Sequence, residues 1–388
     1  MMKKRKIIAV TGARSEYDLM FSIYEKLNQR DDIDFSIIIT GPHLSEKYGL
    51  TSEYIERDHF KISEKIYSLL DSDQKLARIA SIGNQIPLLA QTLSREKPDI
   101  VLVAGDREEA ISVCMTCAFM DIAVAHFFGG DIAKDGNIDN SVRYAASKFA
   151  HLHFTTLEEH KKNLLKLGEE DWRITVMGNP ALDRFLAIET VSKNDVLKHF
   201  GISYDKNYCV LIQHSIITEV EEQRKRILIT LEAIAESGYF CFINYPNSDA
   251  GSSEIIRAYD EYIMKYPKQF KVFKNLDRLQ YVNLLRNADF LLGNSSSGLL
   301  EAPSLGLAAI NIGSRQRGRV HGDNVIFVDN DKDQIVKAID FVNTNEEYLE
   351  KVAKKQNPYG DGNSAEKAVE VLTSVEINKN LIYKNITY

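Results

Sequence analysis

Short apolar runs rich in β-branched residues alternate with helix-length amphipathic segments along almost the whole sequence. This alternation is typical of parallel β-α-β units, in which each strand is followed by a helix that crosses back over the sheet. Several runs are apolar nearly throughout, as expected for strands covered by helices on both faces. The predicted strands are residues 6–12, 34–40, 99–105, 122–130, 151–156, 173–178, 208–214, 240–246, 270–275, 289–296, 308–313 and 325–330.

The alternation is interrupted once, after "GNPALD" (178–183), by a charged stretch at 190–206. A chain of 388 residues is too long for one typical core and suits two domains. We predict an α/β protein with two doubly wound, Rossmann-like domains, residues 1–185 and 186–365. The final helix and tail, in residues 366–388, are not followed by a predicted strand, and we expect them to pack back on the first domain. Ligands of such folds bind beyond the carboxyl ends of the strands, here in the cleft between the domains.

Composition argues against several kinds of partner. With 44% hydrophobic residues, 27% charged residues and a net charge of -7, the chain has no general surface for nucleic acid or for an anionic membrane. The basic start "MMKKRK" precedes an apolar run too short for a signal peptide or a membrane span, which predicts a cytoplasmic protein. "CMTC" has the spacing of a redox or metal motif, but without a second ligand pair nearby we favour buried free thiols for Cys114 and Cys117.

Polar loops follow the predicted strands directly. The loop "GNSSSG" (293–298) separates a strand from a helix-like stretch, and free N–H groups at such a helix start favour a phosphate oxygen. An ordinary turn with Ser297 as N-cap is the alternative. Glu301 lies one helical turn further on, where its carboxylate could accept hydrogen bonds from ribose hydroxyls. The run has neither the Walker lysine nor the dinucleotide-binding glycine triplet.

Arginines and acids gather in the same strand-end loops. Together with His214, the arginines favour a diphosphate site, although each alone could be a surface charge. They are Arg14, Arg107, Arg143 and Arg315. The acids that could transfer protons are Asp106, Asp131 and Asp139, of which Asp139 could equally cap a helix. Phe127 and Phe128 are expected to serve packing.

Taken together, the motifs resemble those of the hydrolysing UDP-N-acetylglucosamine 2-epimerases, over nearly the whole chain and in the same order. They are "TGARSEYD", "TGPHLSEKYG", "AGDREEA", "AHFFGGD", "GNIDNSVRYAASKFAHLHF", "VMGNPALD", "PNSDAGS", "GNSSSGLLEAPSLG" and "INIGSRQRGR". The resemblance implies a glycosyltransferase-B-like fold and an anti elimination of UDP followed by addition of water, giving a free N-acetylmannosamine-type sugar for sialic-acid-like nonulosonates. It implies a UDP-linked sugar as substrate, no metal or other cofactor, and a homo-oligomer.

The resemblance also assigns residues. It implies diphosphate contacts for Arg14, Arg107 and His214, phosphate binding by Ser295 and Ser296, and ribose binding by Glu301. Asn247, Asp249, Arg315 and His43 match further cleft positions. Asp106 and Asp139 match acids required for catalysis, and Arg143 is expected to orient the substrate.

One departure from the family pattern lies in the motif "AHFFGGD" (125–131). The sialic-acid members have a catalytic glutamate where this chain has Phe128, and a second glutamate where it has Asp131. Phenylalanine cannot transfer a proton, so Asp131 or another group takes that role, or the substrate differs. An aromatic wall suits a 6-deoxy sugar, which favours a UDP-2,4-diacetamido-2,4,6-trideoxy sugar beside UDP-N-acetylglucosamine. Ser215 after His214 and a slightly longer loop at 131–139 are further departures.

Three alternatives remain open on the sequence. A non-hydrolysing epimerase would return the UDP-sugar, and product analysis separates it from the hydrolysing enzyme. A glycosyltransferase of the same architecture would need an acceptor. A nucleotide-sugar binder without catalysis would be stabilised by ligand but would turn nothing over.

Overall fold

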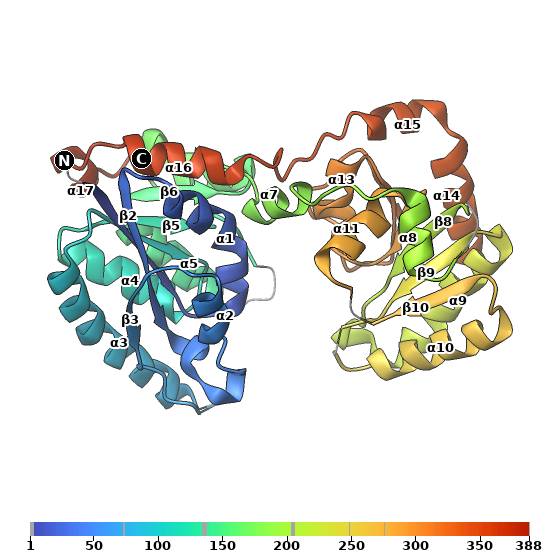
Figure 1. Ribbon diagram of the computed structural model, residues 1–388, viewed down its shortest axis with the longest axis horizontal. Helices are drawn as coiled ribbons and strands as arrows, with labels where there is room; N and C mark the ends of the chain where they lie inside the picture. The colour runs from blue at the N-terminus through green and yellow to red at the C-terminus, as the bar shows by residue number, and fades with distance from the viewer. Residues whose placement is uncertain are drawn as a thin grey trace. The chain divides into compact units, whose positions relative to one another are not determined.

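The computed structural model describes residues 4–72, 74–133, 138–202, 206–247, 249–274 and 276–387. The chain forms two compact units (Figure 1). Unit 1 consists of Met1–Arg184 together with Gly362–Tyr388, and unit 2 consists of Phe185–Asp361. Unit 2 is therefore continuous in sequence, whereas unit 1 consists of two segments that are separated by unit 2 in the sequence.

Among the described residues of unit 1, seven parallel strands form one sheet in the order β3-β2-β1-β4-β5-β6-β7. The strands are β1 (Arg5–Thr11), β2 (Ile33–Thr40), β3 (Ile62–Ile66), β4 (Ile100–Ala104), β5 (Ala123–Phe127), β6 (Leu152–Thr155) and β7 (Ile174–Val176). Alternate residues of β1 enter two separate apolar clusters, with Ile7 on one face of the sheet and Ile8 on the other. Both faces are thus buried, which explains the near-continuous apolar runs.

Helices cover both faces of this sheet. The helices of unit 1 are α1 (Arg14–Asn28), α2 (Ser52–Arg57), α3 (Lys75–Glu96), α4 (Glu108–Phe119), α5 (Asp139–Phe149), α6 (Glu158–Lys166), α16 (Ser364–Ser374) and α17 (Lys379–Ile382). Helix α7 (Pro180–Leu186) runs from the end of the first segment of unit 1 into unit 2. Cys114 and Cys117 lie on α4 as buried free thiols within the core, as the sequence predicted. No helix within the described ranges is both long enough and apolar enough to cross a membrane.

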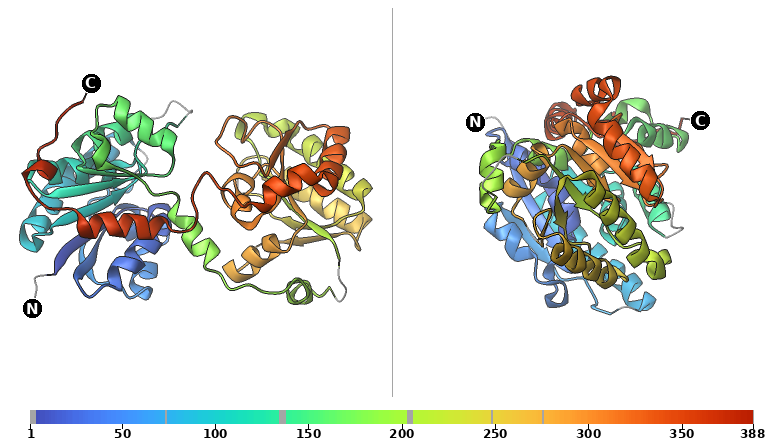
Figure 2. Two further views of the ribbon diagram at one scale, coloured as in Figure 1. Left: turned by 90° about the horizontal axis from the view of Figure 1, so that it is seen from above. Right: turned by 90° about the vertical axis from the view of Figure 1, so that its right-hand side faces the viewer.

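The C-terminal segment completes unit 1. Helix α16 packs against α1 (Figure 2), and Ala365 and Leu372 belong to the same apolar cluster as β1. The start of α16 is capped by Asp183, whose carboxylate accepts hydrogen bonds from the backbone N–H groups of Ser364 (3.1 Å) and Ala365 (2.7 Å). The aspartate of the "GNPALD" run therefore holds a segment that lies far along the chain.

The described residues of unit 2 form a second sheet of six parallel strands, in the order β10-β9-β8-β11-β12-β13. Its strands are β8 (Tyr208–Ile212), β9 (Phe240–Asn244), β10 (Phe270–Phe273), β11 (Phe290–Gly293), β12 (Ala308–Ile312) and β13 (Val325–Val328). The helices are α8 (Lys193–His199), α9 (Gln223–Ser237), α10 (Ser252–Lys265), α11 (Arg278–Arg286), α12 (Ser297–Leu300), α13 (Ala302–Leu305), α14 (Lys332–Thr344) and α15 (Glu346–Ala353). Apolar clusters again lie on both faces.

The predicted fold class, two doubly wound α/β domains, is confirmed. Each predicted strand region contains an observed strand, but β3 was missed. Its sequence "ISEKI" carries charged residues at the edge of the sheet, and four of its five residues are only half-buried. An edge strand with water on part of its surface does not show the apolar run by which the other strands are recognised.

Candidate active site

In unit 1 the strand order reverses between β1 and β4, which are neighbours in the sheet. Ligands of doubly wound folds bind beyond the strands at such a switch point. The loops that meet there are Gly12–Ala13, after β1, and Gly105–Arg107, after β4. The loop after β5 and the start of α5 lie along the same carboxyl edge.

Asp106, Asp131 and Arg143 are brought together at this edge. Arg143 is buried on α5 and forms an ion pair with the Asp106 carboxylate, while its Nη1 donates to the Asp131 carbonyl oxygen at 3.0 Å. The guanidinium is thus already bonded inside the protein, and its Nε is buried without a partner. Asp139 lies one turn before Arg143 as the first residue of α5, and the N-cap position is held by Ile138. The N-cap alternative for Asp139 is therefore wrong.

Asp131 is held as an anion by His160 of α6. The ring Nε2 of His160 lies 3.3 Å from the Asp131 Oδ1, and the backbone N–H of Ile132 donates to the same oxygen at 2.8 Å. The hydrogen bond with His160 is the largest of the influences that lower the pKa of Asp131 to about 2. Asp131 therefore has no proton to give at neutral pH, but its carboxylate is half-exposed and can accept one.

Phe128 has an unusual backbone. It adopts a φ of 66°, and its N–H donates to the Phe154 carbonyl oxygen at 2.8 Å. An aromatic residue in this left-handed region costs on the order of 1–2 kcal/mol, so the surrounding fold must hold it there. The packing interpretation is confirmed for Phe127, which is fully buried and stacks on Phe154 with a centroid distance of 4.5 Å. Phe128 is half-buried and packs against the same apolar cluster.

Two buried acids that the sequence did not predict as site residues are Glu16 on α1 and Glu109 on α4. The Glu109 carboxyl occupies the space above Gly12 and Gly41, where a Cβ on either glycine would overlap it. Each acid has one buried oxygen without a hydrogen-bond partner. Burial, followed by the nearby Glu109 charge, raises the pKa of Glu16 to about 8, and burial also raises the pKa of Glu109. The available signal was the pair of glycines at adjacent strand ends, which indicates a close approach by another group.

Two histidines near these loops serve the structure. His43 is buried, with Nε2 3.1 Å from Thr11 Oγ1 and Nδ1 2.7 Å from Thr51 Oγ1, and burial lowers its pKa to about 4. Both ring nitrogens of His43 are thus bonded within unit 1 and none is left for a ligand. His126 is likewise bonded on both sides, to the Gly105 carbonyl oxygen (2.7 Å) and to Ser147 Oγ (3.0 Å).

The two predicted diphosphate arginines of unit 1 are exposed. The side chain of Arg14 is 64% exposed, with the Asp18 carboxylate 3.6 Å away and the ring of Tyr54 beneath it at 5.2 Å. Arg107 precedes the first residue of α4 and is also exposed. Both are accessible to a ligand, and neither is held in place by a buried partner.

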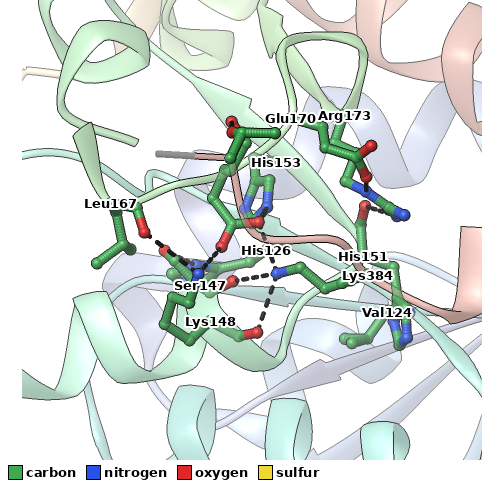
Figure 3. Close-up of polar contacts among 12 residues, drawn as sticks. Val124, His126, Ser147, Lys148, His151, His153, Leu167, Glu170, Arg173 and Lys384 are labelled. Carbon is green, nitrogen blue, oxygen red and sulfur yellow. Dashed lines mark hydrogen bonds and ion pairs between the residues drawn. The ribbon is translucent and has the colours of Figure 1, made fainter. Parts of the chain in front are cut away.

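A buried polar cluster lies at the C-terminal end of α5, where Lys384, His153 and Lys148 come together (Figure 3). Lys384 of the tail donates to the carbonyl oxygens of Ser147 (3.1 Å) and Lys148 (2.9 Å) at the end of α5. Its Nζ also lies 2.6 Å from Glu169, which pairs with His153 as well. Burial alone would raise the pKa of Glu169, but His153 and Lys384 lower it to about 2, and burial lowers the pKa of Lys384 to about 8. The tail is thereby joined to the far end of the helix that carries Asp139 and Arg143.

In unit 2 the strand order reverses between β8 and β11, and Asn294 joins the loops that follow them. Its side chain accepts from the His214 N–H at 2.7 Å and donates to the His214 carbonyl oxygen at 2.9 Å. Its own carbonyl oxygen accepts from Arg315 Nη1 (3.0 Å) and Gln316 Nε2 (3.1 Å). The predicted residues His214 and Arg315 are therefore close together.

The tautomer of His214 follows from its contacts. Its Nδ1 accepts the backbone N–H of Asn247 at 3.1 Å, so the neutral ring carries its proton on Nε2. Burial and the nearby Arg315 charge lower the pKa of His214 and keep the ring neutral. The Asn247 side chain in turn bonds to the Asp249 carboxylate. His214 thus offers one N–H donor at the end of β8.

The loop "GNSSSG" leads into two short turns of helix, α12 and α13, rather than into the single helix that the sequence suggested. Ser297 is the first residue of α12 and Ser296 precedes it without a side-chain cap, so the N-cap alternative for Ser297 is wrong. Ser295 Oγ accepts the Ser297 N–H at 3.2 Å. Glu301, between the turns, has one buried oxygen without a partner, and burial raises its pKa. A hydroxyl donor from a ligand would satisfy that oxygen.

The two units differ in what they can do chemically. Unit 1 presents carboxylates, one of them held ionised, and two buried acids whose pKa values are raised by burial. Unit 2 presents the His214 ring N–H and Arg315 as donors, together with the Asp249 carboxylate and the buried Glu301 carboxyl. Within the described ranges, no three His, Cys, Asp or Glu side chains are grouped so as to hold a metal ion.

Residues 25–373 match the family model described as UDP-N-acetylglucosamine 2-epimerase. The chain belongs to this family. A UDP-N,N'-diacetylbacillosamine 2-epimerase (hydrolyzing) of Legionella pneumophila is 34% identical over 385 residues, covering 99% of this chain and 100% of that protein. A GDP/UDP-N,N'-diacetylbacillosamine 2-epimerase (hydrolyzing) of Campylobacter jejuni is 34% identical over 342 residues, or 87% and 88% of the two chains.

Solved structures share the epimerase fold. The crystal structure of UDP-GlcNAc 2-epimerase from Neisseria meningitidis bound to UDP-GlcNAc matches with a TM-score of 0.76 at 23% identity, covering 95% of this chain and 99% of that chain. The present chain is thus an enzyme of the 2-epimerase family with a two-domain α/β fold. Within that family fold, Phe128 and Asp131 lie in the loop after β5, and Asp131 is bonded to Arg143 of the Asp106–Arg143 pair.

Proposed function

We propose that this protein is a hydrolysing 2-epimerase for a UDP-linked 2,4-diacetamido-2,4,6-trideoxy sugar, which it converts to the free 2-epimer and UDP. The single observation that carries the proposal is the 34% identity, over almost the full length of both chains, to the Legionella relative whose name states that reaction and substrate. The half-buried Phe128 supports a donor whose C6 is a methyl group rather than a hydroxymethyl group.

The proposed reaction has two steps. A base removes the proton from C2, the C1–O bond breaks, and UDP leaves with the electron pair, so that a C1–C2 double bond forms. Water then supplies a hydroxyl to C1, and a proton returns to C2 on the opposite face. No oxidant or metal is needed for this balance. The enzyme must therefore provide a base, a proton donor and a site that stabilises the departing diphosphate.

Unit 1 would carry the proton transfers in this proposal. Asp131 is ionised and half-exposed, which supports it as a base. The Asp106 carboxylate is kept in place by Arg143, and Asp139 lies one turn away on α5. We infer that Arg143 positions Asp106 and does not contact the sugar directly, because its guanidinium is already bonded to Asp106 and Asp131.

Unit 2 would bind the nucleotide. The Nε2–H of His214 and the guanidinium of Arg315 would donate to the diphosphate, and the unpartnered Glu301 oxygen would accept from a ribose hydroxyl. The further binding residues that we propose, from either unit, are Arg14, Arg107, Asn247, Asp249, Ser295 and Ser296. His43 is left out of the set because both of its ring nitrogens are bonded. We also propose a cytoplasmic homo-oligomer that serves nonulosonate synthesis.

Proton NMR in D2O tests this function. Separate samples contain UDP-2,4-diacetamido-2,4,6-trideoxyglucose, its GDP-linked counterpart, and UDP-N-acetylglucosamine. The GDP donor is included because the Campylobacter relative is named for both nucleotides. We expect free 2-epimerised sugar with deuterium at C2, released together with UDP and fastest from the UDP-linked diacetamido donor. A UDP-sugar product, or transfer only to an added acceptor, would contradict the hydrolysing mechanism. Stabilisation by the ligand without turnover would indicate a nucleotide-sugar-binding protein without catalysis.

A further inference from the structure

Unit 1 contains a cavity of about 280 Å³ beside the switch point. Its walls come from the loops after β2 and β3, the first half of α3, and the start of α4. Sites for whole small ligands are usually about 300–1,000 Å³, so this cavity suits one arm of a nucleotide sugar better than a complete second molecule. Arg107 and Glu109, which follow β4, lie in its wall and connect it to the proposed sugar site.

Glu109 provides an unsatisfied polar group in this wall. The residue is 5% exposed, and its Oε2 is buried without a hydrogen-bond partner. Gly12 and Gly41 make the room for its carboxyl, as described above. Burial raises its pKa and favours the neutral acid, which can both donate and accept a hydrogen bond. A neutral ligand with its own acceptor and donor, such as a secondary amide, matches this wall.

The wall also carries charged groups of both signs, Lys75, Arg78, Arg107 and Glu108. Arg78 is paired with Glu108, which lines the same cavity. A group that entered fully would meet the Glu109 carboxyl and, near it, the second buried acid Glu16. Burial raises the pKa of both carboxyls, so this end of the cavity offers hydrogen bonds to a neutral group.

The remaining wall is partly apolar. Leu69 comes from the loop after β3, and Ile82 comes from α3. These side chains can cover the methyl group of an acetamide, while Glu109 satisfies its polar atoms. The polar and apolar groups of the wall and the cavity volume of about 280 Å³ together match an N-acetyl group.

The position of the cavity distinguishes between the two ends of the sugar. In the proposed reaction the C1–C2 bond faces Asp106 and Asp131, which follow β4 and β5. From the start of α4 the cavity extends to the other side of β1, where the loops after β2 and β3 form its far wall. In a pyranose ring the bond opposite C1–C2 is C4–C5, which carries the C4 substituent and C6. The part of the donor directed toward the cavity is therefore its C4 end.

We propose that this cavity is the subsite for the C4 acetamido group of the donor sugar, with Glu109 as its hydrogen-bonding partner and Leu69 and Ile82 against its methyl group. The inference rests on the proposed function and assigns Glu109 and Ile82 as specificity-determining residues. A donor with a C4 hydroxyl, such as UDP-N-acetylglucosamine, would leave the cavity unfilled.

The experiment measures kcat/KM for the UDP-linked diacetamido donor and for UDP-N-acetylglucosamine, and compares the ratio among variants. Ile82→Trp fills the cavity and should lower the preference for the diacetamido donor more than about tenfold. Glu109→Leu removes the hydrogen-bonding group and should lower it about three- to tenfold. Glu109→Gln keeps a neutral donor and acceptor and should retain the preference. Ile79→Trp, on the same helix but 59% exposed and outside the cavity wall, is the matched control.

A second readout does not depend on turnover. Saturation-transfer NMR on the wild-type protein should show the C4 acetamido methyl of the diacetamido donor as strongly contacted as the C2 acetamido methyl, and Ile82→Trp should weaken only the former. The proposal would be overturned if a folded Ile82→Trp protein kept the wild-type ratio of the two kcat/KM values and the wild-type saturation of the C4 acetamido methyl. It would also be overturned if the wild-type rate depended sigmoidally on donor concentration and became hyperbolic in this variant without a change in that ratio, because the cavity would then hold a regulatory ligand. If the wild-type enzyme turns over neither donor, the proposed function fails instead.

Discussion

The two units use the same architecture with opposite polar chemistry at their strand ends. Both have a parallel sheet whose order reverses once, between β1 and β4 in unit 1 and between β8 and β11 in unit 2. Carboxyl groups dominate the loops of unit 1, where Asp106 is paired with Arg143 and Asp131 with His160. Unit 2 instead offers the ring Nε2–H of His214, whose Nδ1 accepts the Asn247 backbone N–H, and Arg315, which donates to the Asn294 carbonyl oxygen. In the proposed function, one fold would thus carry proton transfer in one unit and anion binding in the other.

The largest expected effect comes from unit 1. Asp106→Asn should lower kcat about 10²–10⁴-fold while UDP affinity stays within about threefold, because a proton-transfer group or its positioning is lost and the nucleotide site is not. Steady-state kinetics and calorimetric UDP titration measure the two quantities. Asp171→Asn, an exposed acid of the same unit, is the control. A parallel loss of UDP affinity would remove the distinction between the units.

Lys384→Met tests whether the buried cluster stabilises unit 1 alone. Removing one member of a buried ionic group costs about 3 kcal/mol, and Glu169 still keeps Lys148 and His153 as partners. The single tryptophan, Trp172, lies in unit 1 and reports its unfolding by fluorescence in denaturant. Hydrogen exchange of unit 2 amides should be unchanged, and the exposed Lys379→Met should have little effect. Equal destabilisation of both units would argue against a local role.

His214→Ala should act on binding rather than on proton transfer. Loss of an N–H donor to a charged diphosphate is worth about 1.5–3 kcal/mol, so the Kd for UDP should rise about 10–100-fold with a smaller change in kcat. Isothermal titration with UDP measures it, with His199→Ala, an exposed histidine of unit 2, as control. A kcat loss as large as that of Asp106→Asn at unchanged affinity would place proton transfer in unit 2 as well.

The smallest effect is the pH dependence of stability from Glu16. Its pKa is raised to about 8 by burial, so the folded state keeps a proton that the unfolded chain releases near the ordinary value of 4.5. This contribution is full below pH 4.5 and is lost as the pH rises through 8. Between pH 6 and pH 7 this contribution should fall by about 1 kcal/mol, so Glu16→Gln should change the pH dependence of the unfolding free energy by about that amount relative to the wild-type protein. Glu25→Gln, exposed on the same helix, should not.

Sequence patterns predicted the fold and the position of the polar loops because both follow from local periodicity. They did not predict the pairing of Asp106 with Arg143, which joins residues 37 positions apart through the packing of α5. Glu16 and Glu109 were missed because their burial depends on the space above Gly12 and Gly41. The left-handed backbone of Phe128 has no signature in its residue type, since such a conformation is enforced by the surrounding fold.

The return of the C-terminal segment to unit 1 sets an order for folding during synthesis. Residues 185–361 form a continuous unit that leaves the ribosome before α16 and the tail do. Until those segments follow, the side of α1 that α16 covers is open to water. The buried guanidinium of Arg173 also lacks the carbonyl oxygens of Asn380 and Leu381 that accept its hydrogen bonds. During synthesis unit 2 can therefore be completed first, while the apolar side of α1 in unit 1 stays uncovered until α16 emerges.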